Sequence, residues 1–275
     1  MIGHDKLMTL FKASGTIVAK GPLYVGSGNT AIRPAAVDME FIKIQTVDGE
    51  EIPFIPGSSL KGVIRSSVER VVKAVNFYAC DVAGNPCYKK NGKDISKELN
   101  VLLKEGKIED ARKLLDDTLC YVCKIFGNQI YSSHVKFMDA YGIKWEYGVR
   151  PGVAINREQG SVAFGPFFTE FVQPGSEFSF SMIAENLEPY QLGLIAVAIS
   201  ELNAGRVKLG GLKSRGMGDV EVIFDSIQYR TTDSKYQVSL PSPPPKKDYE
   251  TLKDFTKKVL NALTKRWEEY VTKTQ

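Results

Sequence analysis

Several residue types and patterns are scarce in this 275-residue sequence, and each scarcity excludes a class of protein. Only two histidines occur, so we do not expect catalysis by a pair of imidazoles. No run of about 18 apolar residues is present, which argues against a membrane-spanning helix and a membrane partner. The first residues contain no apolar stretch of signal-peptide length, and we therefore expect a cytoplasmic protein.

The overall composition is that of an ordinary globular protein. Hydrophobic residues make up 43% of the chain and charged residues 25%, which excludes disordered and fibrous classes. The chain is long enough for one elaborated domain or two small ones. Its formal net charge of +4 is mildly basic, which fits an anionic partner without identifying one.

Cysteine is scarce too, and its four copies lie close together in the sequence: Cys80, Cys87, Cys120 and Cys123. The Cys-x-x-Cys pair at 120–123 has the spacing of a tetrahedral zinc site. One or two disulfides are the alternative, although these are unusual in cytosol outside hyperthermophiles, and unpaired thiols are the third possibility. A thioredoxin-like redox site is not expected, because the βαβ context of such a site is missing.

A glycine-rich loop at residues 209–220 is a candidate phosphate-binding element. Four of its residues are glycines, which allow positive φ and close backbone approach: Gly210, Gly211, Gly216 and Gly218. Lys213 and Arg215 add cationic donors. Helical apolar spacing before the loop and alternation after it predict a helix-to-strand turn. The alternative is a flexible helix C-terminus that ends in glycine.

A second candidate anion-binding element is the helix predicted after Pro56-Gly57-Ser58-Ser59, with a serine cap and one apolar face. Lys61 and Arg65 lie one turn apart near its start. Backbone N–H groups and the helix dipole favour an anion at this end. The alternative is a solvated basic face.

The order of predicted elements indicates an α+β protein with a ferredoxin-like or RRM-like core, because it runs strand, helix, strand, hairpin, helix, strand. We expect this core over residues 1–232, with a helical, cysteine-containing insertion at 76–125 and a projecting β-hairpin at 142–182. A proline-rich linker at 233–248 and a C-terminal amphipathic helix at 249–275 follow. The aromatic RNA-binding signature of RRM domains is absent.

Three stretches, in this order, carry a resemblance to a known family: Phe54–Gly62, Ile125–Asn128 and Leu209–Gly218. Together they resemble the repeat-associated mysterious protein (RAMP) superfamily of CRISPR-associated proteins over about residues 7–230. The resemblance is closest to the repeated backbone subunit of type III effector complexes of the Csm type. It implies that several copies, or paralogous subunits, line a guide RNA (crRNA) as a filament.

The resemblance assigns RNA contacts to three parts of the chain. The glycine-rich loop and the Lys61/Arg65 helix face would hold guide phosphates without reading the sequence. The 142–182 hairpin resembles the family's thumb, which wedges between guide and single-stranded target RNA, and its Arg150 and Arg157 are further candidate contacts. Within it, Asn156 replaces the acid of the family's Ile-Asp-Arg segment.

The resemblance also implies a catalytic residue. Csm-type members need an aspartate after the first strand to cut target RNA, and alignment from Leu23 places Asp38 there. A carboxylate can position Mg²⁺ or another divalent cation, or accept the proton of a ribose 2′-OH, which would make the protein a metal-dependent endoribonuclease. Some family members carry zinc in the insertion. Three alternatives stay open: a loop carboxylate without a role, an inactive structural RNA-binding subunit, and a stand-alone processing ribonuclease.

Overall fold

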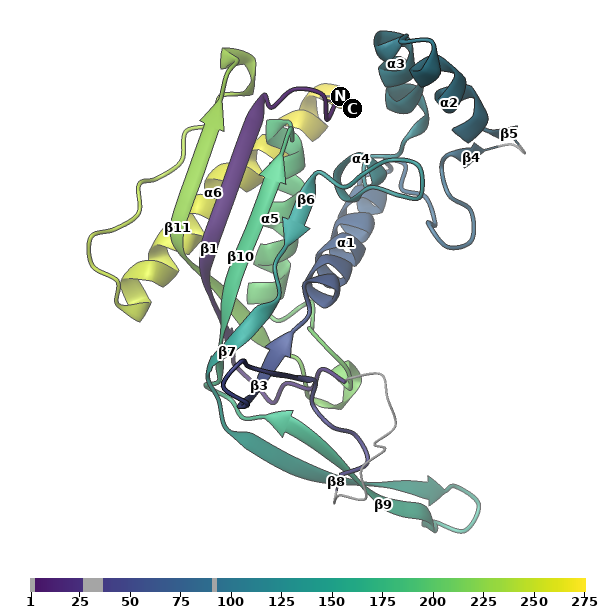
Figure 1. Ribbon diagram of the computed structural model, residues 1–275. Helices are drawn as coiled ribbons and strands as arrows, with labels where there is room; N and C mark the ends of the chain where they lie inside the picture. The colour runs from purple at the N-terminus through teal and green to yellow at the C-terminus, as the bar shows by residue number, and fades with distance from the viewer. Residues whose placement is uncertain (1–2, 27–36, 91–92) are drawn as a thin grey trace.

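The protein, described here from a computed structural model for residues 3–26, 37–90 and 93–275, is built on one antiparallel sheet (Figure 1). Its central strands are β1 (Thr9–Ala19), β6 (Val135–Phe137), β10 (Glu177–Glu185) and β11 (Val220–Thr231). Helices α1 (Gly57–Ala74) and α5 (Pro189–Asn203) connect them. The spatial order β11-β1-β10-β6 is that of a ferredoxin-like fold, so the predicted α+β, ferredoxin-like class is confirmed.

Three further strands widen the sheet beyond β10. They are β7 (Ala140–Lys144), β3 (Glu51–Ile55) and β2 (Lys43–Gln45), paired in that order. This extension also starts α1, because the N–H of Gly57 donates to the Asp139 carboxylate at 2.7 Å. The predicted serine cap is therefore wrong: Pro56 is the N-cap residue, and the acceptor comes from a distant turn.

The alternation of the strands separates two faces of the sheet. In β10 buried and half-buried residues alternate without a break, and Phe178, Phe180, Met182 and Ala184 form part of the core. Helix α5 lies over this core (Figure 1) and is apolar on most sides, because α1 and α6 (Tyr249–Thr274) also pack on it. The opposite face of the sheet carries polar residues, including exposed Lys12.

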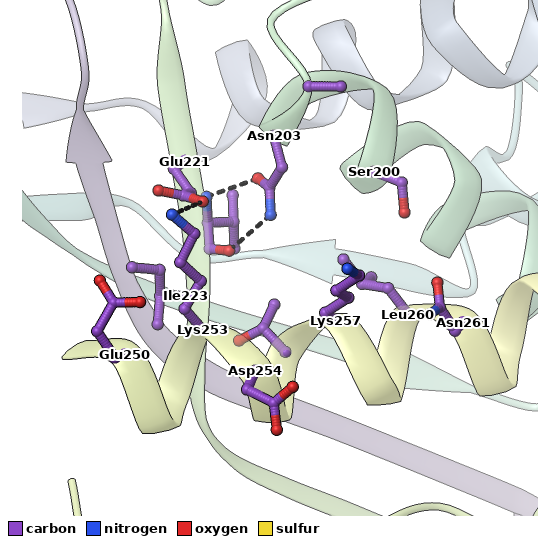
Figure 2. A pocket seen from close by; sticks show the side chains of 13 residues that line it. Ser200, Asn203, Glu221, Ile223, Glu250, Lys253, Asp254, Lys257, Leu260 and Asn261 are labelled. Atoms are coloured by element: carbon purple, nitrogen blue, oxygen red, sulfur yellow. Dashed lines mark hydrogen bonds and ion pairs between the residues drawn. The ribbon is translucent and has the colours of Figure 1, made fainter. Parts of the chain in front are cut away.

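The outer edge of β11 is closed by side chains from two helices. Asn203 of α5 accepts from the N–H of Val222 at 2.7 Å and donates to its carbonyl at 2.9 Å (Figure 2). Thr256 of α6 accepts from the N–H of Phe224 at 2.7 Å. These contacts satisfy backbone groups that an edge strand would otherwise expose. The same helices border a hollow of about 420 Å³ (Figure 2).

The cysteine-containing insertion lies beyond one end of α1 (Figure 1). It comprises β4 (Lys89–Lys90), β5 (Lys93–Asp94), α2 (Ser96–Lys104), α3 (Ile108–Thr118) and the one-turn α4 (Cys123–Phe126). Helix α3 ends at Thr118, two residues before Cys120. The chain is extended at Leu119, which leads into the Cys-x-x-Cys turn.

The thumb hairpin consists of β8 (Tyr147–Asn156) and β9 (Ser161–Val172), which pair with each other and project from the core (Figure 1). The projecting part is shorter than the expected 142–182, because residues 177–182 belong to β10 in the main sheet. Five large hydrophobic side chains on the hairpin are exposed: Val149, Val153, Ile155, Val162 and Phe164.

Two short 3-10 turns, η1 (Lys213–Arg215) and η2 (Ser234–Tyr236), lie in the glycine-rich loop and the proline-rich linker. None of the helices in the described part of the chain combines the length and apolar character needed to cross a membrane.

Two helical glycines test the packing of α5 on α6. A Cβ at Gly193 of α5 would lie 2.7 Å from the carbonyl oxygen of Leu263 and 2.8 Å from the nitrogen of Trp267, whereas a Cβ at Gly62 of α1 meets nothing within 4 Å. We expect Gly193→Ala to destabilise the fold by about 1–3 kcal/mol, because α6 must move. The matched Gly62→Ala should stabilise it by up to about 1 kcal/mol through helix propensity. Urea unfolding compares the two, and equal effects would contradict the close helix contact.

Candidate nucleic-acid interface

The glycine-rich loop packs tightly on the segment that follows β1. The N–H of Gly211 donates to the carbonyl of Tyr24, and that of Gly218 to the carbonyl of Pro22, both at 2.8 Å. Gly210 has a φ of 78°, and a Cβ there would lie 2.1 Å from the Tyr24 oxygen. Glycine is required for this contact. The loop is therefore held in place by backbone contacts. This differs from the alternative interpretation, in which the segment is a flexible helix C-terminus.

The tip of the loop presents polar side chains to solvent. Residues 213–215 form η1, with left-handed backbone at Leu212 before it and at Gly216 after it. Lys213 and Arg215 are exposed. A Cβ at Gly216 would meet nothing within 4 Å. Glycine is favoured at this position because the backbone has a φ of 82°, and not because another group lies close.

A groove runs between α1 and the glycine-rich loop. It consists of two hollows, of about 350 and 310 Å³, that share Val63 and Lys213. The α1 side is lined by one helical stripe, Ser59, Gly62, Val63, Ser66, Ser67 and Arg70, and the other side by Val25, Gly26 and residues 206–208, 210, 211 and 213. We call this the α1–loop groove.

The second hollow of the α1–loop groove is lined by basic side chains, two of which form ion pairs with acidic residues outside it. Among the described residues, its lining contains four basic side chains and no acidic one: Arg70, Arg206, Lys208 and Lys213. Arg206 is paired with Glu201 and Lys208 with Asp219 outside the lining. The Ser67 hydroxyl is buried there without a hydrogen-bond partner in the described structure. A hydroxyl beside several cations is suited to an anionic oxygen.

The two α1 residues predicted from the sequence to bind RNA do not line this groove. Lys61 and Arg65 lie on the neighbouring stripe of the helix, and neither lines the groove. Burial and the nearby Arg65 charge lower the pKa of Lys61. The Arg65 guanidinium donates to Glu69 and to the Gly127 carbonyl, both at 3.1 Å, so it is turned toward the insertion.

Sequence reasoning missed the groove residues Ser67, Arg70, Arg206 and Lys208. A signal for Arg70 was present, since Gly62, Ser66 and Arg70 recur every four residues on one side of α1. Lys208 directly precedes the glycine-rich loop and could have been included with it.

At its base the thumb hairpin contacts the glycine-rich loop through Arg150. The guanidinium donates to the Arg215 carbonyl at 3.2 Å and lies 5.7 Å from the Phe171 ring centre. Arg157 sits in the turn at the far end of the hairpin (Figure 1), so the structure does not bring it to the groove. There Asn156 closes the turn by accepting from the N–H of Glu158 at 2.9 Å.

Asp38 lies at the base of the thumb hairpin. Its carboxylate accepts from the N–H of Phe168 at 2.7 Å, and its own N–H donates to the Phe168 carbonyl at 3.1 Å. The residue is exposed, so the anchored carboxylate faces solvent. The part of this loop at 27–36 lies outside the described residues.

A small apolar cluster lies under these segments. Tyr24, Phe171 and Met217 are buried together, and Met39 and Leu212 pack against them. The cluster joins the segment after β1, the thumb base, the Asp38 segment and the glycine-rich loop. Segments far apart in the sequence are thereby fixed side by side.

The four cysteines form a buried cysteine cluster on the insertion side of α1. All four sulfurs lie within 4.8 Å of one another, the cysteines are free thiols, and Cys80 Sγ lies 3.5 Å from Cys123 Sγ and 3.7 Å from Cys120 Sγ. Zinc–sulfur bonds of about 2.3 Å place tetrahedral sulfurs about 3.8 Å apart. Burial raises the pKa of Cys80, whereas the hydrogen bond with Cys123 lowers that of Cys120. The cluster could hold a metal such as zinc.

The ferredoxin-like fold alone does not determine function, but a groove lined by basic side chains beside a projecting hairpin is suited to binding a nucleic acid. The family model of the RAMP superfamily matches residues 16–221, which is more than half of the chain. The chain therefore belongs to the RAMP superfamily. Membership implies a CRISPR-associated protein with RNA partners that assembles into a complex. No curated protein matches the chain.

Proposed function

We propose that the protein is a guide-RNA-binding backbone subunit of a type III CRISPR interference complex. The observation that carries this proposal is the α1–loop groove, in which four basic side chains line one hollow and the fixed backbone of the glycine-rich loop lines the adjoining one. Such groups contact phosphates and sugars, so binding would not depend on the guide sequence. A subunit that accepts many guides requires this independence.

The thumb hairpin supports assembly with target RNA and neighbouring subunits. Its exposed apolar residues include Phe164, which is 73% exposed, and Ile155, which is 63% exposed. Exposed apolar side chains gathered on one projecting element indicate a surface that a partner covers. According to the family resemblance, the partners that cover this surface are the crRNA–target duplex and further copies of the chain or paralogous subunits.

The groove proposal predicts the effect of removing two cations. Arg70→Ala combined with Lys213→Ala should weaken single-stranded RNA binding for every sequence tested, because phosphate contacts are lost. The slope of log K against log salt should fall by about 0.7 per lost contact. Fluorescence anisotropy with two unrelated labelled RNAs at several salt concentrations measures both quantities.

The matched control removes two cations from the helix-free face of the sheet. Lys12 and Arg230 are exposed there, on β1 and β11. Lys12→Ala combined with Arg230→Ala should leave affinity and salt slope near the wild-type values. If this pair lowers RNA affinity while the groove pair does not, RNA lies on the open sheet, as in RRM domains, and the groove assignment is wrong.

A second activity, cleavage of the bound target RNA, is favoured by the position of Asp38. Its exposed carboxylate is anchored to β9 at the junction of the thumb hairpin and the glycine-rich loop. A hydrated Mg²⁺ is commonly held by one carboxylate together with phosphate oxygens and water, so Asp38 fits such an ion beside RNA. The cation would stabilise charge on the phosphate. The alternative is an inactive structural subunit.

Asp38→Asn separates these two functions. Asparagine keeps an oxygen that can accept from the Phe168 N–H, so the loop stays anchored, but the negative charge is lost. We expect cleavage of complementary RNA by the assembled complex with Mg²⁺ to fall by at least about 100-fold while guide binding is unchanged. Cleavage at the wild-type rate would rule out Asp38 as the catalytic residue. If the wild-type complex does not cut the target, the protein is the inactive structural subunit of the alternative.

We further propose that the cysteine cluster binds one structural zinc ion. Four buried thiols come together here, two from the start of the insertion and two from its end, and this supports the assignment. Protein purified without chelator should contain about one zinc per chain, and Cys87→Ser should lose most of it together with the thermal stability that binding adds. Metal analysis and thermal unfolding with and without chelator provide the test. Protein without bound metal and insensitive to added zinc would contradict it.

A further inference from the structure

The sulfurs of the cysteine cluster are surrounded by hydrogen-bond donors from three directions. Cys123 Sγ accepts from Arg65 Nη2 at 3.5 Å, and Cys120 Sγ accepts from the Cys123 N–H at 3.4 Å. Asn128 Nδ2 lies 3.9 Å from Cys87 Sγ. Donors in this position stabilise thiolate charge, which a bound metal requires.

Arg65 differs from the other donors because it carries a full charge. A divalent cation with four thiolates has a net charge of −2, which is unfavourable in a buried site unless a cation compensates it. Among the described residues, Arg65 is the one cationic side chain that hydrogen-bonds a sulfur of the cluster. Its side chain is 19% exposed, so water screens the interaction only partly.

The guanidinium is held in a fixed direction by two further contacts. Nε forms an ion pair with Glu69 one turn along α1 at 3.1 Å, so the carboxylate and thiolate acceptors share the charge of Arg65, and Nη1 donates to the carbonyl of Gly127. Gly127 has a φ of 73°, and a Cβ there would lie 2.6 Å from the Tyr131 carbonyl, so its backbone position is also fixed. A planar fork with three directed donors matches this site, and a lysine ammonium does not.

Arg65 therefore connects two of the sequence stretches that carry the family resemblance. It belongs to the helix that begins after Pro56, and it contacts the Ile125–Asn128 segment directly after the last cysteine. This arrangement explains why an arginine one turn from Lys61 is turned away from the α1–loop groove.

We propose that Arg65 is a positioning residue of the metal site, which donates a charged hydrogen bond to the Cys123 thiolate and fixes Cys123 against α1, and that it is not an RNA contact. The inference rests on the proposed metal binding by the cysteine cluster. It predicts that the metal affinity of the site depends on a side chain that is not a ligand.

The test measures zinc affinity by competition with a chromophoric chelator for the full chain and three variants. Arg65→Met keeps length and removes charge and donors, and we expect zinc binding to weaken about 10- to 100-fold. Arg65→Lys restores the charge without the fork, and it should bind with intermediate affinity. Lys73→Met removes an exposed cation from the same helix and should bind as wild type does.

A spectroscopic readout separates positioning from a general loss of stability. In Co²⁺-substituted protein the thiolate-to-metal charge-transfer band should shift in Arg65→Met, because Cys123 loses a donor, and should not shift in Lys73→Met. If Arg65→Met fails to fold, the zinc affinity and the Co²⁺ spectrum of Arg65→Lys are compared with those of Lys73→Met instead. Wild-type zinc affinity in the folded Arg65 variant overturns the inference, whereas absence of zinc binding by wild-type protein overturns the metal proposal itself.

Discussion

The candidate interface depends on a small apolar contact beneath it, the packing of Tyr24, Phe171 and Met217 with Met39 and Leu212. Side chains of this size each contribute roughly 1.5–3 kcal/mol when fully buried, so the cluster is strong enough to order the loops above it. Four segments meet there: the exit of β1, the Asp38 segment, the thumb base and the glycine-rich loop. The polar surface that we propose for RNA binding is thus positioned by apolar contacts beneath it.

Helix α1 contributes three different faces to the molecule. Its apolar face, which includes Leu60 and Val68, joins the core, and the stripe through Gly62 and Arg70 lines the α1–loop groove. The neighbouring stripe carries Arg65 toward the cysteine cluster. A metal bound by the cysteines would support the groove indirectly, since it would fix the helix whose other side lines the proposed path of the RNA. The proposed structural and RNA-binding roles therefore belong to different sides of one helix.

The sequence was informative where local physics determines the structure. Periodicity predicted the fold class, and the glycines of the loop at 209–220 predicted close backbone approach, which Gly210 and Gly218 make. It was misleading where a partner is distant in sequence. The cap of α1 comes from Asp139, 82 residues away, and the choice between the Lys61 and Arg70 stripes depends on which neighbour each stripe meets. Helical spacing identifies a stripe and does not reveal its neighbours.

The central claim, that RNA lies between α1 and the glycine-rich loop, is tested most directly by ultraviolet cross-linking of the RNA-bound protein followed by mass spectrometry of the cross-linked peptides. The account predicts cross-links in peptides that contain residues 57–74 and 205–219, with further cross-links at the base of the thumb hairpin. Cross-links confined to β1 and β10 on the helix-free face of the sheet, with none in those two peptides, would contradict it.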